Sequence, residues 1–190
     1  MPFNEVKQFS EAERDDLRAI ARQAIEYGLS HGTKCPVDLE RLSQNLHQPG
    51  ASFVTLQIQG QLRGCIGSLE AHLPLAQDVS DNAFNAAFQD PRFVPLKQGE
   101  LNSLDIHISV LTPAQAMHFS SEQDLLRQLR PGIDGLLLET DAHRGTFLPS
   151  VWEALPEPED FLRQLKLKAG LAPDYWSDDI RISRYETVYL

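Results

Sequence analysis

Two β-rich runs in the first half of the chain constrain its fold more than any other stretch. They cover residues 51–58 (ASFVTLQI) and 62–67 (LRGCIG), and Gln59, Gly60 and Gln61 lie between them. Two such runs joined by a short turn that contains glycine predict a β-hairpin. Because successive side chains of a strand alternate between its faces, Arg63 and Cys65 should point the same way.

The register of this hairpin is open between two alternatives. A two-residue turn at Gln59-Gly60 fits the turn chemistry best and would place Cys65 opposite Val54. A loop over 59–61 would instead separate an apolar face from a polar one. Burial normally decides the register, so we favour this second alternative. Its apolar face would carry Val54, Leu56, Ile58, Leu62 and Ile66, and its polar face Thr55, Gln57, Arg63 and Cys65.

The order of the predicted elements indicates the fold class. Helices are predicted over 10–29, with a capping box from Ser10 to Glu13, and over 74–88, 120–130 and 158–168. Further strands are predicted over 101–111, 117–119, 135–140, 146–148 and 183–190. Hairpins followed by helices favour antiparallel sheets over β-α-β units.

We therefore expect an α+β fold of two subdomains, each an antiparallel β-sheet with helices packed on it. Pro113 ends a predicted strand and is the candidate boundary. The larger subdomain would comprise residues 1–113 and 176–190, with the hexapeptide 62–67, because the last strand should return to the first sheet. The smaller subdomain would comprise residues 114–175.

Composition excludes several classes of function. The 190-residue chain has a net charge of -10, which argues against a nucleic-acid groove. No stretch approaches the roughly 20 apolar residues of a membrane span, and residues 1–10 lack an apolar signal core, so we expect a cytoplasmic protein. The two cysteines should be reduced. No histidine shows metal-ligand spacing, and we expect neither a metal nor a cofactor.

Cys65 is the main candidate for chemistry. A thiolate is the nucleophilic form of cysteine, and a neighbouring cation such as Arg63 favours it. Gly64 and Gly67 would let a ligand approach the backbone and could expose N–H groups to an oxyanion. The alternative is that both glycines only allow tight packing and Cys65 is a small core residue.

Other polar residues are weaker candidates. His143 lies in a predicted turn and could be a general base, or simply an exposed loop histidine. Asp90 and Arg92 could form a local salt bridge that pins their turn, or Arg92 could bind an anion. A polar set that could line a cleft beside Cys65 comprises Glu70, Asn82, Asp90 and Arg92.

Four stretches resemble one protein family in the same order. They are the hexapeptide 62–67, residues 82–96 with Asp90-Pro91-Arg92-Phe93, residues 145–152 (GTFLPSVW), and residues 166–171 with Lys168-Ala169-Gly170. Together they are similar to the AMMECR domain family, named after a human chromosomal region, from about Ser10 to the C-terminus. The variant resembles the bacterial branch, protein A of the AmmeMemoRadiSam system. The resemblance implies an α+β fold of two unequal subdomains and an activity that is not established.

Two functional hypotheses follow. In the first, the protein is an enzyme with Cys65 as nucleophile and Arg63 as activator, acting on a small carbonyl or electrophilic substrate. Cys65 would line a cleft whose far wall includes Thr146 and Phe147. In the second, the hexapeptide surface of a non-catalytic adaptor docks a partner. The resemblance implies partners of that kind, a Memo-type protein and a radical SAM protein.

Overall fold

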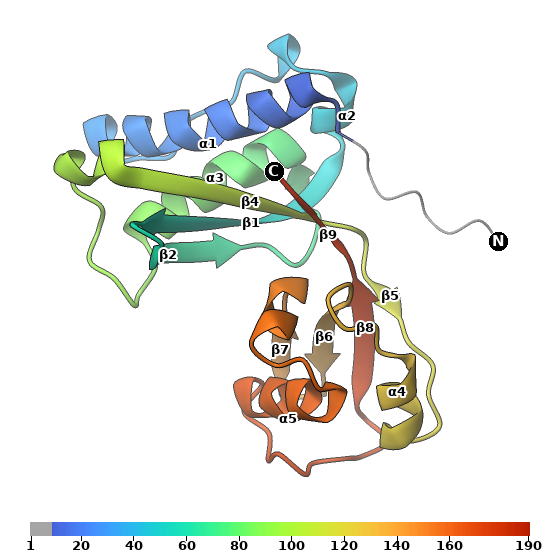
Figure 1. The fold of residues 1–190 in the computed structure, drawn as a ribbon. Coiled ribbons are helices and arrows are strands. Elements are labelled where there is room, and N and C mark those ends of the chain that lie inside the picture. The colour runs from blue at the N-terminus through green and yellow to red at the C-terminus, as the bar shows by residue number, and fades with distance from the viewer. Residues whose placement is uncertain (1–8) are drawn as a thin grey trace. The chain divides into compact units, whose positions relative to one another are not determined.

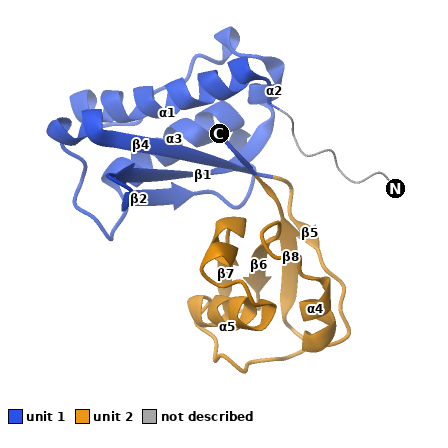
Figure 2. Cartoon of the chain, viewed as in Figure 1, with its two compact units in different colours: residues 1–111, 188–190 blue, residues 112–187 orange. Residues whose placement is uncertain are grey.

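The computed structural model describes residues 9–190, which form two compact units (Figures 1 and 2). Unit 1 runs to Leu111 and includes residues 188–190, and unit 2 comprises residues 112–187. Each unit has its own antiparallel sheet, its own helices and its own hydrophobic core, which confirms the predicted α+β fold. Most of the polar stretch 1–10 lies outside the described residues.

Unit 1 is a sheet with helices on one face (Figure 1). Its strands follow the order β2-β1-β4-β9, and the short β3 pairs with β1. The elements are α1 (Glu11–His31), η1 (Leu39–Arg41), α2 (Gln44–His47), β1 (Pro49–Ile58), β2 (Gln61–Gly67), β3 (Leu73–Pro74), α3 (Leu75–Phe88), η2 (Gln98–Ser103), β4 (Leu104–Leu111) and β9 (Thr187–Tyr189).

Helix α1 begins and ends where its capping residues predict. Ser10 accepts a hydrogen bond from the N–H of Glu13, and the Glu13 carboxylate accepts one from the N–H of Ser10, so the capping box is present. Gly32 ends the helix in the left-handed conformation. Gly28 lies inside the helix, where its missing side chain leaves room for the ring of Phe88. The helix was predicted to end at Leu29, with Gly28 and Gly32 marking its end, and it runs two residues further, to His31.

Helix α3 lies between α1 and the sheet. Pro74 precedes its first turn, and the apolar stripe predicted for this helix is buried. That stripe consists of Leu75, Val79, Ala83, Ala86 and Ala87. The alanines let the helix backbone come close to β2, and this close approach determines the geometry of the hexapeptide.

Unit 2 is a four-stranded sheet with the strand order β5-β8-β6-β7. Its elements are β5 (Gln115–Ala116), α4 (Glu122–Gln128), β6 (Gly135–Glu139), β7 (Arg144–Phe147), η3 (Pro149–Glu153), α5 (Pro158–Lys168) and β8 (Arg181–Tyr185). The core centres on Phe161 of α5, whose ring stacks on Trp152 at 3.8 Å between centroids. The strand predicted over 117–119 lies instead at β5, two residues earlier.

The C-terminal residues divide between the two sheets, which differs from the expectation. Residues 183–190 were predicted as one strand of the first sheet, but they contribute to both sheets. β8 pairs with β5 and β6, and only β9 joins β4. Tyr185 packs its ring over Gly135, which holds β8 in the second sheet. Residues 176–187 therefore group with unit 2 and not with unit 1.

Candidate functional site

The hexapeptide hairpin combines features of both predicted registers. Gln59 and Gly60 form a two-residue turn with φ values of 52° and 76°, and Ile58 pairs with Gln61. A β-bulge follows, because Gln57 pairs with Leu62 whereas Leu56 pairs with Gly64. The extra residue is Arg63, which has no partner on β1. Beyond the bulge the pairing matches the three-residue alternative.

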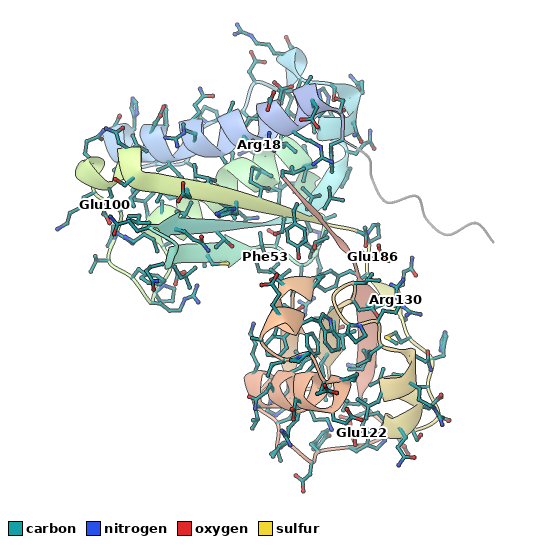
Figure 3. All side chains as sticks on the ribbon, viewed as in Figure 1. Arg18, Phe53, Glu100, Glu122, Arg130 and Glu186 are labelled. Carbon is teal, nitrogen blue, oxygen red and sulfur yellow. The ribbon has the colours of Figure 1, made fainter. Side chains whose placement is uncertain are left out.

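The bulge changes where two predicted side chains lie. Leu62 pairs with Gln57 and remains 43% exposed, so its predicted place on the apolar face is wrong. Arg63 forms two hydrogen bonds with Glu100 of η2, Nε to Oε1 at 2.7 Å and Nη2 to Oε2 at 3.1 Å (Glu100 is labelled in Figure 3). These bonds are the main cause of the lowered pKa of Glu100. Arg63 therefore has a carboxylate as its partner.

The cation that lies beside Cys65 is Arg92. Its Nη2 donates to the carbonyl oxygen of Cys65 at 3.1 Å. The pKa of Arg92 is raised, chiefly by its hydrogen bond to Asp90 and further by the nearby Cys65. The arginine that contacts Cys65 thus comes from the turn after α3 and bonds its backbone carbonyl, whereas Arg63, the cation expected from the same strand, bonds Glu100.

Asp90 and Arg92 form a clamp on the outer edge of β2. Asp90 Oδ2 accepts the N–H of Cys65 at 2.9 Å, and Arg92 donates to the Cys65 carbonyl. Asp90 also accepts from Arg92 Nε at 2.9 Å and Nη2 at 2.6 Å. β2 is the edge strand of its sheet, so these side chains take the place of a missing neighbouring strand. The Arg92 hydrogen bonds hold the pKa of Asp90 well below its usual range.

The Cys65 thiol lies on the sheet face opposite the helices. Val54 and Leu56 are buried on the helix side, so Thr55 between them points to the other face, together with its register partners Cys65 and His107. Thr55 Oγ1 donates to Cys65 Sγ at 3.2 Å, and the cysteine is half-buried. The thiol is therefore held in place and remains accessible.

The two glycines of the hexapeptide allow tight packing. A Cβ at Gly64 would lie 2.1 Å from the carbonyl oxygen of Ala86 in α3. A Cβ at Gly67 would lie 2.2 Å from the ring of Phe53. The amide of Cys65 is bonded to Asp90, so it is not free to bind an oxyanion. The glycines match the packing alternative.

A second polar cluster holds the residue that follows the hexapeptide. Asn82 Nδ2 donates to Ser68 Oγ at 3.1 Å and to Asp78 Oδ2 at 3.0 Å, and Ser52 Oγ donates to the same Asp78 oxygen at 2.6 Å. Burial raises the pKa of Asp78. Glu70 accepts a hydrogen bond from His72 Nε2 at 2.9 Å.

The remaining predicted site residues belong to unit 2. His143 Nδ1 bonds the carbonyl oxygen of Ala169 at 3.0 Å, which ties the β6–β7 turn to the end of α5. Thr146 Oγ1 donates to the Leu136 carbonyl at 2.7 Å. Phe147 packs edge-on against Phe161. All three have partners within the core or the turns of unit 2.

Three residues around the hairpin were not named as site candidates: Thr55, which was expected only to share the polar face of Cys65, Glu100, which bonds Arg63, and His107, which pairs with Thr55. The alternation of strand residues places Thr55 and His107 on polar faces and could have indicated them. Glu100 lies 37 residues after Arg63, and no local pattern indicates that pairing.

Two features that would indicate a metal site or a membrane span are absent from residues 9–190. No group of three or more His, Cys, Asp or Glu side chains lies close enough together there to hold a metal ion. In the same range, no helix has both the length and the apolar character needed to cross a bilayer.

Comparison with known proteins places the chain in a family. A protein of Methanothermobacter thermautotrophicus is 38% identical over 190 residues, which cover 94% of this chain and 95% of that protein. A protein of Saccharolobus islandicus is 40% identical, covering 90% of this chain and 78% of that protein. The crystal structure of an uncharacterized protein from Pyrococcus horikoshii matches with a TM-score of 0.88 and 31% identity, covering 95% of this chain and 92% of that one. The AMMECR1 family model matches residues 18–190, and the chain therefore belongs to the AMMECR1 family.

Proposed function

We propose that Cys65 is the nucleophile of a site for a small electrophilic substrate, and that Arg92 has the role first assigned to Arg63. The observation that carries the proposal is the position of the thiol. It is half-buried on the helix-free face, it accepts a hydrogen bond from Thr55, and Arg92 is bonded to the same residue. A hydroxyl donor and a nearby cation both favour the thiolate, which is the attacking form.

The surroundings of the thiol favour one kind of electrophile. Acyl transfer needs N–H donors aimed at a developing oxyanion. The amide of Cys65 is bonded to Asp90, and Gly64 is packed against α3. Displacement at a carbon that bears a leaving group needs no such donors. We therefore favour substrates that react with Cys65 by displacement of a leaving group at carbon, and not by acyl transfer at a carbonyl.

Alkylation of the thiol by iodoacetamide tests the proposal. The protein would carry Cys35→Ala, because Cys35 is a buried second thiol whose pKa is raised by burial. We expect Cys65 to react at pH 7 several times faster than the thiol of N-acetylcysteine. Arg92→Ala should slow the reaction several-fold, and Arg63→Ala should leave it unchanged because Glu100 holds Arg63. A wild-type rate no higher than that of the free thiol would contradict the proposal.

The second candidate is a docking module of the AmmeMemoRadiSam type, as in the bacterial branch that the four motifs resemble. The packed glycines and the Arg63–Glu100 pair favour it, because they give the hexapeptide a rigid structural role. Leu62 is exposed on that hairpin and could contact a Memo-type or radical SAM partner in the cytoplasm. Binding to either purified partner, measured by calorimetry, should be lost in Leu62→Asp and retained in Cys65→Ser. Equal binding by Leu62→Asp and the wild type would contradict this candidate.

A further inference from the structure

We propose that the electrophile taken by the Cys65 site carries an acidic group, and that Arg92 anchors this group. The inference rests on the proposed function, because it names the substrate class of the same thiol. Its basis is the set of hydrogen-bond donors that Arg92 leaves unused.

The donors of Arg92 divide into a bound edge and a free edge. A guanidinium has five N–H donors in one plane. The Nε donor bonds Asp90 Oδ1, and the two Nη2 donors bond Asp90 Oδ2 and the Cys65 carbonyl. Within residues 9–190, the two donors on Nη1 have no hydrogen-bond partner. The side chain is 54% exposed, so this edge is open to solvent.

Asp90 fixes the orientation of that free edge. The Asp90 side chain is only 2% exposed, and its carboxylate accepts hydrogen bonds from Arg92 Nε and Nη2, so this edge of the guanidinium faces the protein. The guanidinium plane is therefore set before any ligand binds, and less conformational entropy is lost on binding. A planar guanidinium edge matches the oxygens of a carboxylate, which Lys binds only as a point charge.

The other arginine of this region shows what a purely structural pair looks like. Arg63 has a side-chain exposure of 13%, and its partner Glu100 has one of 30%. In the Asp90–Arg92 pair the exposure is reversed, since the carboxylate is buried and the cation faces solvent. An anion that approaches Cys65 therefore meets the cation of this pair first.

Iodoacetate and iodoacetamide form a matched pair of probes for this site. In both reactions the sulfur bonds the methylene carbon, the carbon–iodine bond breaks, iodide leaves, and the thiol proton goes to solvent. The two reagents differ in that only iodoacetate has a carboxylate. The quantity to measure is the ratio of their second-order rate constants, iodoacetate over iodoacetamide, in the Cys35→Ala chain and in N-acetylcysteine.

We expect this ratio to be about five times higher for Cys65 than for N-acetylcysteine, the upper range for an ion pair at a solvent-exposed site. Arg92→Gln, which keeps N–H donors but removes the charge, should bring the ratio down to the reference value. Arg92→Lys should keep part of the preference. Arg18→Gln is the matched control, because Arg18 is an exposed arginine on α1 (labelled in Figure 3) and its loss changes the net charge equally. The control should leave the ratio unchanged.

The outcomes separate the two proposals. Fast iodoacetamide labelling with a ratio equal to that of N-acetylcysteine would overturn the anionic anchor and leave the reactive thiol in place. Slow labelling by both reagents would overturn the proposed function itself. A ratio that falls equally in Arg18→Gln and Arg92→Gln would overturn the anchor, because net charge alone would then explain it. Thermal unfolding of each variant identifies any loss of fold, and Arg92→Lys tests the anchor if Arg92→Gln is unfolded.

Discussion

Two polar clusters hold the hexapeptide hairpin to the region of α3, and they differ in charge. At Cys65 the buried Asp90 is paired with Arg92. At Ser68 the equally buried Asp78 receives only neutral donors, from Ser52 and Asn82. The exposed fractions of the two aspartates are 4% and 3%. Similar burial thus goes with opposite pKa shifts, downward for Asp90 and upward for Asp78.

The difference separates a cluster that can bind a ligand from one that is closed. The Asp90 cluster ends in a guanidinium with free donors at the surface and with a thiol beside it. Every member of the other cluster bonds another member of it or the hairpin backbone. A charged pair with an exposed end suits the recognition of a ligand, whereas a closed, buried cluster suits holding the backbone in place.

The two aspartates also link stability to pH with opposite signs. Asp90 has a lowered pKa, so its stabilising contribution is present above the unfolded-state value of about 3.9 and is lost as the pH falls. Asp78 has a raised pKa, so its contribution is present below about 3.9 and is lost as the pH rises through the folded-state value. At neutral pH, the carboxyl group of Asp90 therefore raises the stability of the fold, and that of Asp78 lowers it.

The largest effect should come from breaking the close contact between β2 and α3. In Gly64→Ala the new Cβ would lie 2.1 Å from the Ala86 carbonyl, so α3 and β2 must separate. We expect the free energy of unfolding to fall by about 3 kcal/mol, the upper range for overpacking. Urea denaturation measures it. Gly99→Ala is the control, because nothing lies within 4 Å of its Cβ position. Equal stability of the two variants would show that the close approach is not required.

The next effect should come from the charged cluster. Asp90→Asn removes the carboxylate that accepts from Cys65 and Arg92 and leaves the amide of Cys65 with a weaker acceptor. We expect a loss of about 2 kcal/mol at pH 7, the size of a hydrogen bond to a charged group. The loss should shrink as the pH is lowered below about 3.9, where the wild type loses the same contribution. A loss that is equal at pH 7 and at pH 3 would contradict the charged interaction as its cause.

The regular parts of this architecture could be predicted from local patterns. The capping box at Ser10 and the buried stripe of α3 follow from spacing along one helix, and the structure confirms both. The turn at Gln59-Gly60 fits turn chemistry, although the loop over 59–61 was the favoured alternative and is wrong at the turn itself. Each of these depends on residues a few positions apart, for which sequence periodicity is informative.

The parts that were not predicted depend on contacts distant in sequence. The bulge places Arg63 beside Glu100 and lets Gly64 lie against Ala86, and neither partner is near in the chain. The cation at Cys65 comes from Arg92, 27 residues later, whereas the two-residue spacing indicated Arg63. The strand at the C-terminus divides near Glu186, whose N–H bonds Thr112 Oγ1, and its alternation pattern contains no break there.

The smallest effect, and the sharpest test of the comparison, should come from Asp78→Asn. The amide oxygen of an asparagine can still accept from Ser52 and Asn82, so the cluster keeps its bonds but no longer holds a buried charge. At pH 8 we expect the variant to be more stable than the wild type by about 1 kcal/mol or less, the size of a neutral hydrogen bond. At pH 4 the difference should be smaller, because the raised pKa of Asp78 leaves more of its carboxyl protonated there than at pH 8. Urea midpoints at the two pH values measure the difference. If the variant, relative to the wild type, is less stable at pH 8 than at pH 4, then Asp78 stabilises the fold as an anion. The pH dependence of stability would then have the same sign in the two clusters.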